Sequence, residues 1–222
     1  MKKFLLVLAA MMILFSATNE VAAKAMTDYE AINNLIVSER LYRVSHRDKE
    51  LAECYAPDAQ IRTSWQSGGV NSFVGQHPAE HANENFNVNR CGGALIHQNG
   101  KRAFVEYPST TIRNVKVNGA DAVLTSYMRL LYLVEKRGGV WKIIDMMSVN
   151  EADELQPVIA GTDLQIRAED AAGLRISYRW LAYVRMKAGE TISNDLPGVD
   201  RPDDVKKIYT EAEAWLNQSD EK

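Results

Sequence analysis

The sequence predicts an α+β fold in which a cone-shaped, curved antiparallel sheet wraps around N-terminal helices. The segment 120–150 reads as two long strands rich in branched and aromatic residues, and the glycine pair at 138–139 suits a two-residue hairpin turn. Asn-Gly pairs at 99–100 and 118–119 supply two further tight turns, so four antiparallel strands follow one another. Helical patterns precede this meander, which is an order typical of α+β domains.

The turn at 138–139 also predicts the register of the last hairpin. In that register one face is apolar apart from a Tyr132–Asp145 pair, and the other face is largely apolar as well. We therefore expect helices to cover one face of the sheet and a core or pocket to form on the other. The predicted pairs are Val134 with Ile143, Tyr132 with Asp145, Leu130 with Met147, and Met128 with Val149.

Composition indicates an ordinary globular protein with one substantial core. The chain has 222 residues, of which 46% are hydrophobic and 25% are charged. Its formal net charge is -3, and Lys and Arg occur only in short pairs. This balance does not favour nucleic acid as a partner.

The N-terminus has the pattern of a secretory signal peptide. Two lysines precede an apolar run over 4–15, and small-residue cleavage patterns end at Ala23 and Ala25. The apolar run is shorter than the roughly 20 residues that span a membrane. We therefore expect a signal peptide over 1–25, no stable membrane anchor after its removal, and a periplasmic or secreted mature protein.

Export leaves two interpretations open for the cysteines. Cys54 and Cys91 would meet an oxidising compartment, where a disulfide can form if their Cα atoms approach within about 7 Å. Cys54 equally suits a buried apolar position on a helix beside Leu51 and Tyr55.

The residues ahead of the meander predict two helices, a strand and a further helix. Thr27 and Glu30 form a capping box at the start of the first helix, whose apolar stripe includes Ile32, Leu35, Ile36 and Tyr42. A short second helix ends at Pro57, and alternating residues over 61–65 predict a half-buried strand. A polar helix is expected to begin at Pro78.

The C-terminal segment 151–222 predicts two helices with apolar stripes. We expect these helices to pack on a barrel domain over 26–150, where they cap the barrel or extend a dimer contact.

Eight short motifs occur in a fixed order along the chain. They are RLYR at 40–43, YAPDA at 55–59, SW at 64–65, VNG at 117–119, GVWKI at 139–143, SYRWLAY at 177–183, DLPGVDRP at 195–202 and AEAWL at 212–216. Together they resemble the SnoaL-like branch of the nuclear transport factor 2-like superfamily, in an uncharacterised bacterial subgroup with a helical C-terminal extension. The resemblance implies a cone-shaped α+β barrel with a deep pocket, often dimeric through its outer sheet face, so a homodimer is one assembly that it implies.

The resemblance implies two kinds of function. Enzymes of the superfamily place an Asp just past the first helix, where this chain has Val44 and Ser45, and often a His before the meander, where it has Asn89. Because these side chains do not titrate near neutral pH, our first interpretation is a pocket for a small hydrophobic molecule that lacks the usual acid/base pair and needs no cofactor. The expected pocket residues are Tyr42, Trp65, Asn89, Tyr132, Asp145 and Met147.

The alternative is an isomerase, dehydratase or cyclase that uses Asp145 or His46. Burial on an apolar strand face would raise the pKa of Asp145, and the Tyr132 hydroxyl would stabilise an oxyanion. The competing interpretation of both residues is structural: Asp145 then faces solvent or pairs with a nearby Lys, and His46 is an ordinary surface histidine. In a third interpretation the protein has a structural role and fills the cavity with its own side chains.

The segment 77–81 matches the H-x-x-E-H zinc pattern, which needs both histidines on one helical turn. Pro78 is tolerated only in the first turn, which leaves His77 at the cap and separates it from His81. We expect no metal site there.

Overall fold

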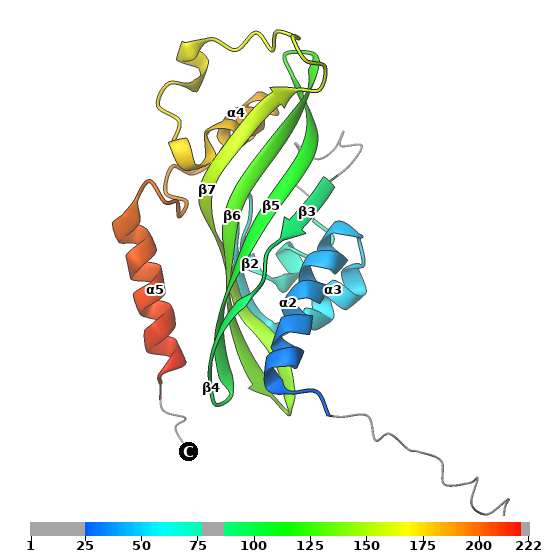
Figure 1. Ribbon diagram of the computed structural model, residues 1–222, viewed down its shortest axis with the longest axis vertical. Coiled ribbons are helices and arrows are strands. Elements are labelled where there is room, and N and C mark those ends of the chain that lie inside the picture. The colour runs from blue at the N-terminus through cyan, green and yellow to red at the C-terminus, as the bar shows by residue number, and fades with distance from the viewer. Residues whose placement is uncertain (1–24, 77–86, 219–222) are drawn as a thin grey trace, which may run out of the picture.

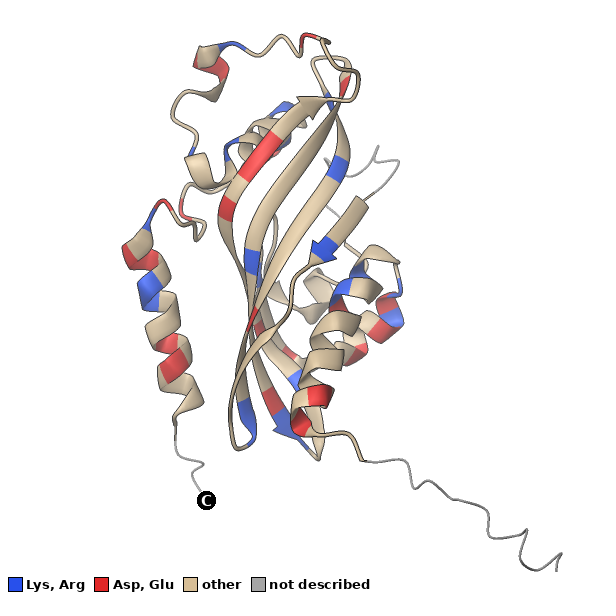
Figure 2. Cartoon of the chain, viewed as in Figure 1, with Lys and Arg blue, Asp and Glu red and all other residues tan. Residues whose placement is uncertain are grey.

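The computed structural model describes residues 25–76 and 87–218. Figure 1 shows a long, curved sheet with α2 and α3 on one side and α5 on the other, while α4 lies near one end of the long strands. Acidic and basic residues are interspersed over the helices and strands (Figure 2). The predicted α+β fold class is confirmed, and the sheet is curved but not closed.

Both predicted N-terminal helices form, but the second ends at Cys54 rather than at Pro57, which lies in the first strand. Helix α2 covers Asp28–Val44. The Thr27 hydroxyl accepts a hydrogen bond from the Glu30 backbone amide, and the Glu30 carboxylate accepts one from the Thr27 backbone amide. These reciprocal bonds satisfy backbone donors that the first helical turn leaves open. Helix α3 covers Asp48–Cys54 and ends where β1 begins.

Seven strands make up one sheet in the described part of the chain. Their order is β2-β1-β7-β6-β5-β3, with β4 also paired to β5, and β1 runs parallel to β7. The first strand ends at Arg62, so Thr63 and Trp65 lie after it rather than within it. The strands are β1 (Tyr55–Arg62), β2 (Ser67–Gly69), β3 (Asn87–Cys91), β4 (Leu95–Asn99), β5 (Arg102–Val117), β6 (Ala120–Arg137) and β7 (Val140–Pro157).

The tight turns at 118–119 and 138–139 are confirmed, whereas the first turn lies one residue later than predicted, at 100–101, because Asn99 pairs with Arg102. Residues 118 and 119 have φ angles of 48° and 87°, and residues 138 and 139 have 58° and 85°. Two consecutive positive φ angles define a type I′ turn, whose twist matches that of the flanking strands. Asn and Gly accept these angles at little cost, which is why these dipeptides indicate hairpins.

The register of the last hairpin follows the prediction only beside its turn. Val134 pairs with Ile143 as expected, but the next pair is Leu133 with Asp145. Ile144 is therefore an extra residue on β7, and this β-bulge moves the β7 side chains from Asp145 to Asn150 to the opposite face relative to β6, until a second bulge at Glu151 restores the alternation. The predicted Tyr132–Asp145 pair is wrong. The pairs found instead are Tyr132 with Met146, Leu130 with Ser148 and Met128 with Asn150.

The main core lies between the concave face of the sheet and the first two helices. It contains Ile32 and Ile36 of α2 and Leu51 of α3, all fully buried. Ile143 and Met146 both belong to this core although they are three residues apart, because the bulge changes the alternation between them.

The C-terminal helices pack on the sheet. Helix α4 (Arg179–Lys187) and α5 (Pro202–Leu216) follow two short 3-10 helices, η3 (Ala168–Ala171) and η4 (Ile176–Tyr178). Helix α4 buries Leu181 against the ends of β5 and β6, and α5 covers the convex face through residues such as Ala212. Strand β7 continues beyond residue 150, so the sheet extends into the segment expected to form the extension.

Some predicted features lie outside the described residues, namely most of the signal peptide over 1–25 and the segment 77–81.

The two cysteines are separate thiols, with Cys54 buried and Cys91 half-buried. Within the described ranges, no helix is long and apolar enough to cross a membrane.

Candidate functional site

A cavity of about 100 Å³ opens on the concave face of the sheet, between the end of α2 and helix α4. We call it the cone cavity. Strands β5, β6 and β7 supply one wall through Thr111, Met128 and Ser148, and the end of α2 supplies another through Arg43 and Val44. Other lining residues are Thr63, Ser64, Asn87, Asn150 and Leu181.

Helix α4 closes one end of the cone cavity. Its Leu181 lines the cavity, and the Leu181 amide donates to the Asp153 carboxylate on β7 at 2.7 Å. Arg185 of the same helix donates to the Ser64 carbonyl at 2.6 Å, next to the lining residue Trp65. The C-terminal extension therefore contributes directly to the cavity wall.

A buried charged cluster lies under the cavity. Glu39 on α2 is fully buried and accepts hydrogen bonds from Tyr55 at 2.8 Å and Tyr132 at 3.0 Å. Arg40 binds the same carboxylate through both Nε and Nη2. Adjacent helical residues rarely face each other, so the pair forms because both side chains turn inward from α2.

The electrostatics of this cluster fix its protonation. Burial lowers the pKa of Arg40, but the nearby Glu39 carboxylate outweighs this and holds that pKa well above its ordinary value. Burial raises the pKa values of Tyr55 and Tyr132, and Glu39 adds to this effect. Both tyrosines are therefore neutral donors, and Arg40 is a permanent cation at the cavity.

A second arginine of α2 joins the cavity to its aromatic wall. The Arg43 guanidinium lies 4.4 Å from the centre of the Phe73 ring and 5.2 Å from that of Trp65. It also donates to the backbone carbonyls of Phe73 and Gln76, at 3.1 and 2.7 Å. Burial, with the charge of Arg40 adding to it, lowers the pKa of Arg43 to about 10.

Neutral polar side chains line the strand wall. The Asn89 amide donates to the hydroxyls of Ser109 at 2.9 Å and Thr111 at 3.3 Å. Its Oδ1 accepts from the Cys91 thiol at 2.8 Å. These bonds hold Asn89 in one orientation beside the cavity.

The comparison with protein families identifies the fold. The sequence profile of the SnoaL-like domain matches residues 24–147, which is more than half of the 222-residue chain. The chain belongs to the SnoaL-like domain family. This confirms the resemblance that its sequence motifs indicate. None of the curated proteins matches the chain significantly.

Solved structures of low sequence identity are similar in fold to this SnoaL-like domain. A putative scytalone dehydratase from Novosphingobium aromaticivorans has 15% identity and a TM-score of 0.48, and the match covers 62% of this chain and 93% of that one. An NTF2-like protein from the same species has 18% identity, coverages of 64% and 86%, and a TM-score of 0.42. Hexachlorocyclohexane dehydrochlorinase LinA-type3 from Novosphingobium barchaimii has 15% identity, coverages of 60% and 90%, and a TM-score of 0.46.

The sequence-predicted pocket residues of the SnoaL-like domain divide between several places. Trp65 and Asn89 line the cone cavity, and so does His46, whose backbone φ is 55°. Tyr132 lies beneath the cavity, where it binds Glu39. Tyr42 is half-buried against the core, and the Arg47 guanidinium covers its ring at 4.4 Å.

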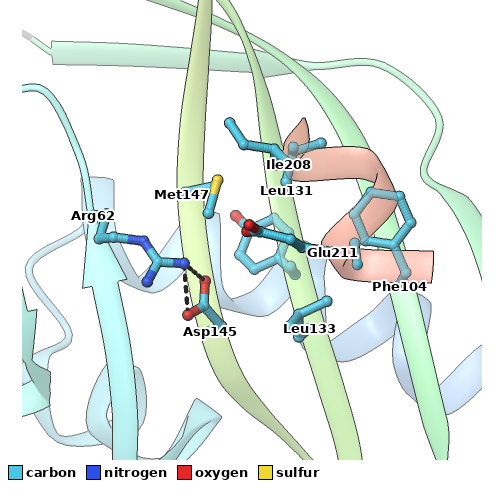
Figure 3. Close-up of a pocket in the computed structure, with 10 residues that line it drawn as sticks. Arg62, Phe104, Leu131, Leu133, Asp145, Met147, Ile208 and Glu211 are labelled. Atoms are coloured by element: carbon cyan, nitrogen blue, oxygen red, sulfur yellow. Dashed lines mark hydrogen bonds and ion pairs between the residues drawn. The ribbon is translucent and has the colours of Figure 1, made fainter. Parts of the chain in front are cut away.

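Asp145 and Met147 lie on the opposite face of the sheet. They line a separate cavity of about 90 Å³ between the convex face and α5, which we call the outer cavity (Figure 3). Asp145 accepts two bonds from Arg62 of the neighbouring strand, at 2.6 and 2.8 Å. Burial raises the pKa of Asp145, and Arg62 opposes that rise. The bulge at Ile144 explains why sequence alternation assigned these residues to the wrong face.

The sequence analysis missed Glu39 and Arg40 as site residues. Glu39 lies seven residues after Ile32 and three after Ile36, which places it on the buried stripe of α2, and this spacing signals a buried acid. Among the described residues, no group of three or more His, Cys, Asp or Glu is arranged to hold a metal ion.

Proposed function

We propose that this SnoaL-like protein binds a small, mainly hydrophobic molecule in the cone cavity. The observation that carries the proposal is the cavity itself, enclosed by α2, the concave face and α4. Ligand sites commonly combine an apolar wall with a few placed polar groups. Here Trp65, Met128 and Leu130 supply the apolar wall, and Asn89 and Thr111 supply polar groups.

The positions expected to hold an acid/base pair support binding rather than catalysis. Val44 and Asn89 both line the cavity, and neither titrates. Ser45, the other residue past the first helix, donates its hydroxyl to the Leu41 carbonyl at 2.6 Å. Asp145 lies on the far side of the sheet and is therefore removed from chemistry in this cavity.

The test blocks the cavity with a larger side chain. We expect small aromatic probes such as phenol, benzamide and benzoate to bind the wild-type protein in ligand-observed NMR, and Ser148→Phe to abolish the signal. Met147→Phe is the matched control, because it adds a ring on the adjacent residue that faces the outer cavity. Binding that survives Ser148→Phe but is lost in Met147→Phe would contradict the proposal.

A second candidate function is isomerase, dehydratase or cyclase chemistry with His46 as the acid/base group. The position of His46 at the cone cavity favours it, since an imidazole ring can accept a proton at one nitrogen and donate one from the other. With a substrate in hand, His46→Gln should then abolish turnover while Asp145→Asn retains it. Unchanged turnover in His46→Gln would exclude this candidate.

We also propose that the protein is exported. The proposal rests on the charged and apolar pattern of the first 25 residues. Expression of the full chain in a bacterial host should give a periplasmic or secreted protein, whose mass shows cleavage near residue 25. A cytoplasmic protein of uncleaved mass would contradict export.

A further inference from the structure

We infer that the ligand of the cone cavity is a small ring-bearing carboxylate whose anionic group is bound by Arg40 and Arg43. This inference rests on the proposed function, because it specifies the chemistry of the molecule in the same cavity.

The charge of the cavity wall is the first observation. Of the described residues that line the cone cavity, three are arginines (Arg40, Arg43 and Arg113), and none is acidic. The Glu39 carboxylate balances Arg40 from below the wall and is fully buried. A buried or half-buried cation is costly unless a counter-charge or hydrogen-bond acceptor accompanies it. An anion inside the cavity would add a counter-charge for Arg43, which contacts two backbone carbonyls and two aromatic rings.

The Arg40 guanidinium is held in one orientation at the cavity wall. Its Nε and Nη2 bind Glu39, which leaves Nη1 as the end of the guanidinium that the carboxylate does not hold. Two further hydrogen bonds, from Tyr55 and Tyr132, hold Glu39 itself in place. Because Arg40 lines the cavity, an anion that binds its Nη1 there would cost the side chain little further freedom.

Arg43 lies one helical turn along α2 from Arg40, so the two guanidinium groups belong to the same face of the helix. Their mutual repulsion adds to the burial that lowers the pKa of Arg43 to about 10. A carboxylate bound between them would relieve that repulsion, and charge-assisted bonds of this type are stronger than neutral ones.

The contacts of Arg43 indicate where an aromatic ring of the ligand would lie. Arg43 covers Phe73 and Trp65, which stack on each other with ring centres 5.8 Å apart. Trp65 and Phe73 also line the cavity, so an apolar surface adjoins the cationic one. A molecule with a ring at one end and a carboxylate at the other matches this division.

The cavity has room for a single aromatic ring. Its volume of about 100 Å³ is several times the roughly 10–15 Å³ that one water molecule needs. A single-ring carboxylate such as benzoate is therefore a suitable probe.

The test compares two probes of equal shape and different charge. We expect isothermal titration calorimetry to show that benzoate binds the wild-type protein at least about tenfold more tightly than benzamide, its neutral analogue. Inorganic phosphate and acetate serve as probes for an anion without a ring. Each should bind more weakly than benzoate, because neither contacts the aromatic wall.

Variants then locate the charge effect. The double variant Glu39→Gln/Arg40→Met removes both charges of the buried pair together, so that neither is left alone, and it should reduce the preference for benzoate over benzamide to less than about threefold. The matched control is Arg62→Met, which removes an arginine that faces the outer cavity and should leave the preference intact. Circular dichroism verifies that each variant is folded, and Arg43→Met provides a second test if the double variant does not fold.

The possible outcomes separate this inference from the proposed function. Equal binding of benzoate and benzamide, both blocked by Ser148→Phe, would overturn the carboxylate inference and leave the binding function standing. Tighter binding of phosphate than of benzoate would also overturn it. Failure of every probe to bind would contradict both the inference and the proposed function.

Discussion

The buried cluster under the cavity gives the sharpest prediction about stability. Substituting Gln for Glu39 keeps the size of the side chain but leaves Arg40 as a buried cation without its counter-charge. Glu39 has no exposed surface, and the Arg40 side chain is only 14% exposed. Removal of one partner from a buried ion pair costs about 3–5 kcal/mol, so we expect Glu39→Gln to lower the free energy of unfolding by that amount.

Three further variants separate the contributions to this loss. Tyr55→Phe and Tyr132→Phe each remove one hydrogen bond to the carboxylate, which is worth about 1.5–3 kcal/mol for a charged acceptor. The double variant Glu39→Gln/Arg40→Met removes both charges, so it should be more stable than Glu39→Gln alone.

Urea denaturation measures these differences as changes in the unfolding midpoint at constant slope. The interaction energy follows from the cycle of Glu39→Gln, Arg40→Met and their combination. A cost below about 1 kcal/mol for Glu39→Gln, the range of an exposed ion pair, would refute the reasoning. A double variant less stable than both single variants would refute it as well.

Three other predictions concern the C-terminal extension. Tyr209→Phe removes a hydroxyl that donates to the Glu106 carboxylate on β5 at 2.5 Å. Urea denaturation should show a loss of about 1.5–3 kcal/mol in the free energy of unfolding, and limited proteolysis should cleave α5 earlier. An unchanged cleavage pattern would argue that this hydrogen bond does not hold α5 on the sheet. Gly198→Ala places a Cβ 2.7 Å from an Asp200 oxygen and should lower the free energy of unfolding by about 1–3 kcal/mol. Gly93→Ala is the control, because its Cβ meets open space and should lower that free energy by less. Equal losses in the two variants would contradict the crowding at Gly198. The Arg175 guanidinium holds the pKa of Asp200 down at about 2 against 3.8. The stabilisation this provides is present above pH 4 and is lost as the pH falls towards 2, so the melting-temperature advantage over Asp200→Asn should shrink across that window, and a constant difference would contradict it.

Features encoded by neighbouring residues could be predicted from the sequence. The turn at Asn118 needs a positive φ, and Asn followed by Gly satisfies this locally. The capping box at Thr27 likewise depends on two residues three positions apart. The resemblance to the SnoaL-like family then fixed the overall arrangement of helices around the sheet.

Features that depend on distant contacts could not be predicted in this way. The extra residue at Ile144 follows no turn or glycine signal, yet it moves Asp145 and Met147 to the convex face. Leu181 reaches the cone cavity only because α4 folds back onto the sheet after a long connection. Glu39 carried a signal in the stripe of α2, but its two tyrosine partners come from β1 and β6.

A crystal structure of the protein soaked with benzoate tests the central claim most directly. We predict that the ring will lie beside Trp65 in the cone cavity and that the carboxylate will lie within hydrogen-bond distance of Arg40 Nη1. A cone cavity filled by the protein's own side chains, or benzoate bound only in the outer cavity beneath α5, would contradict the account.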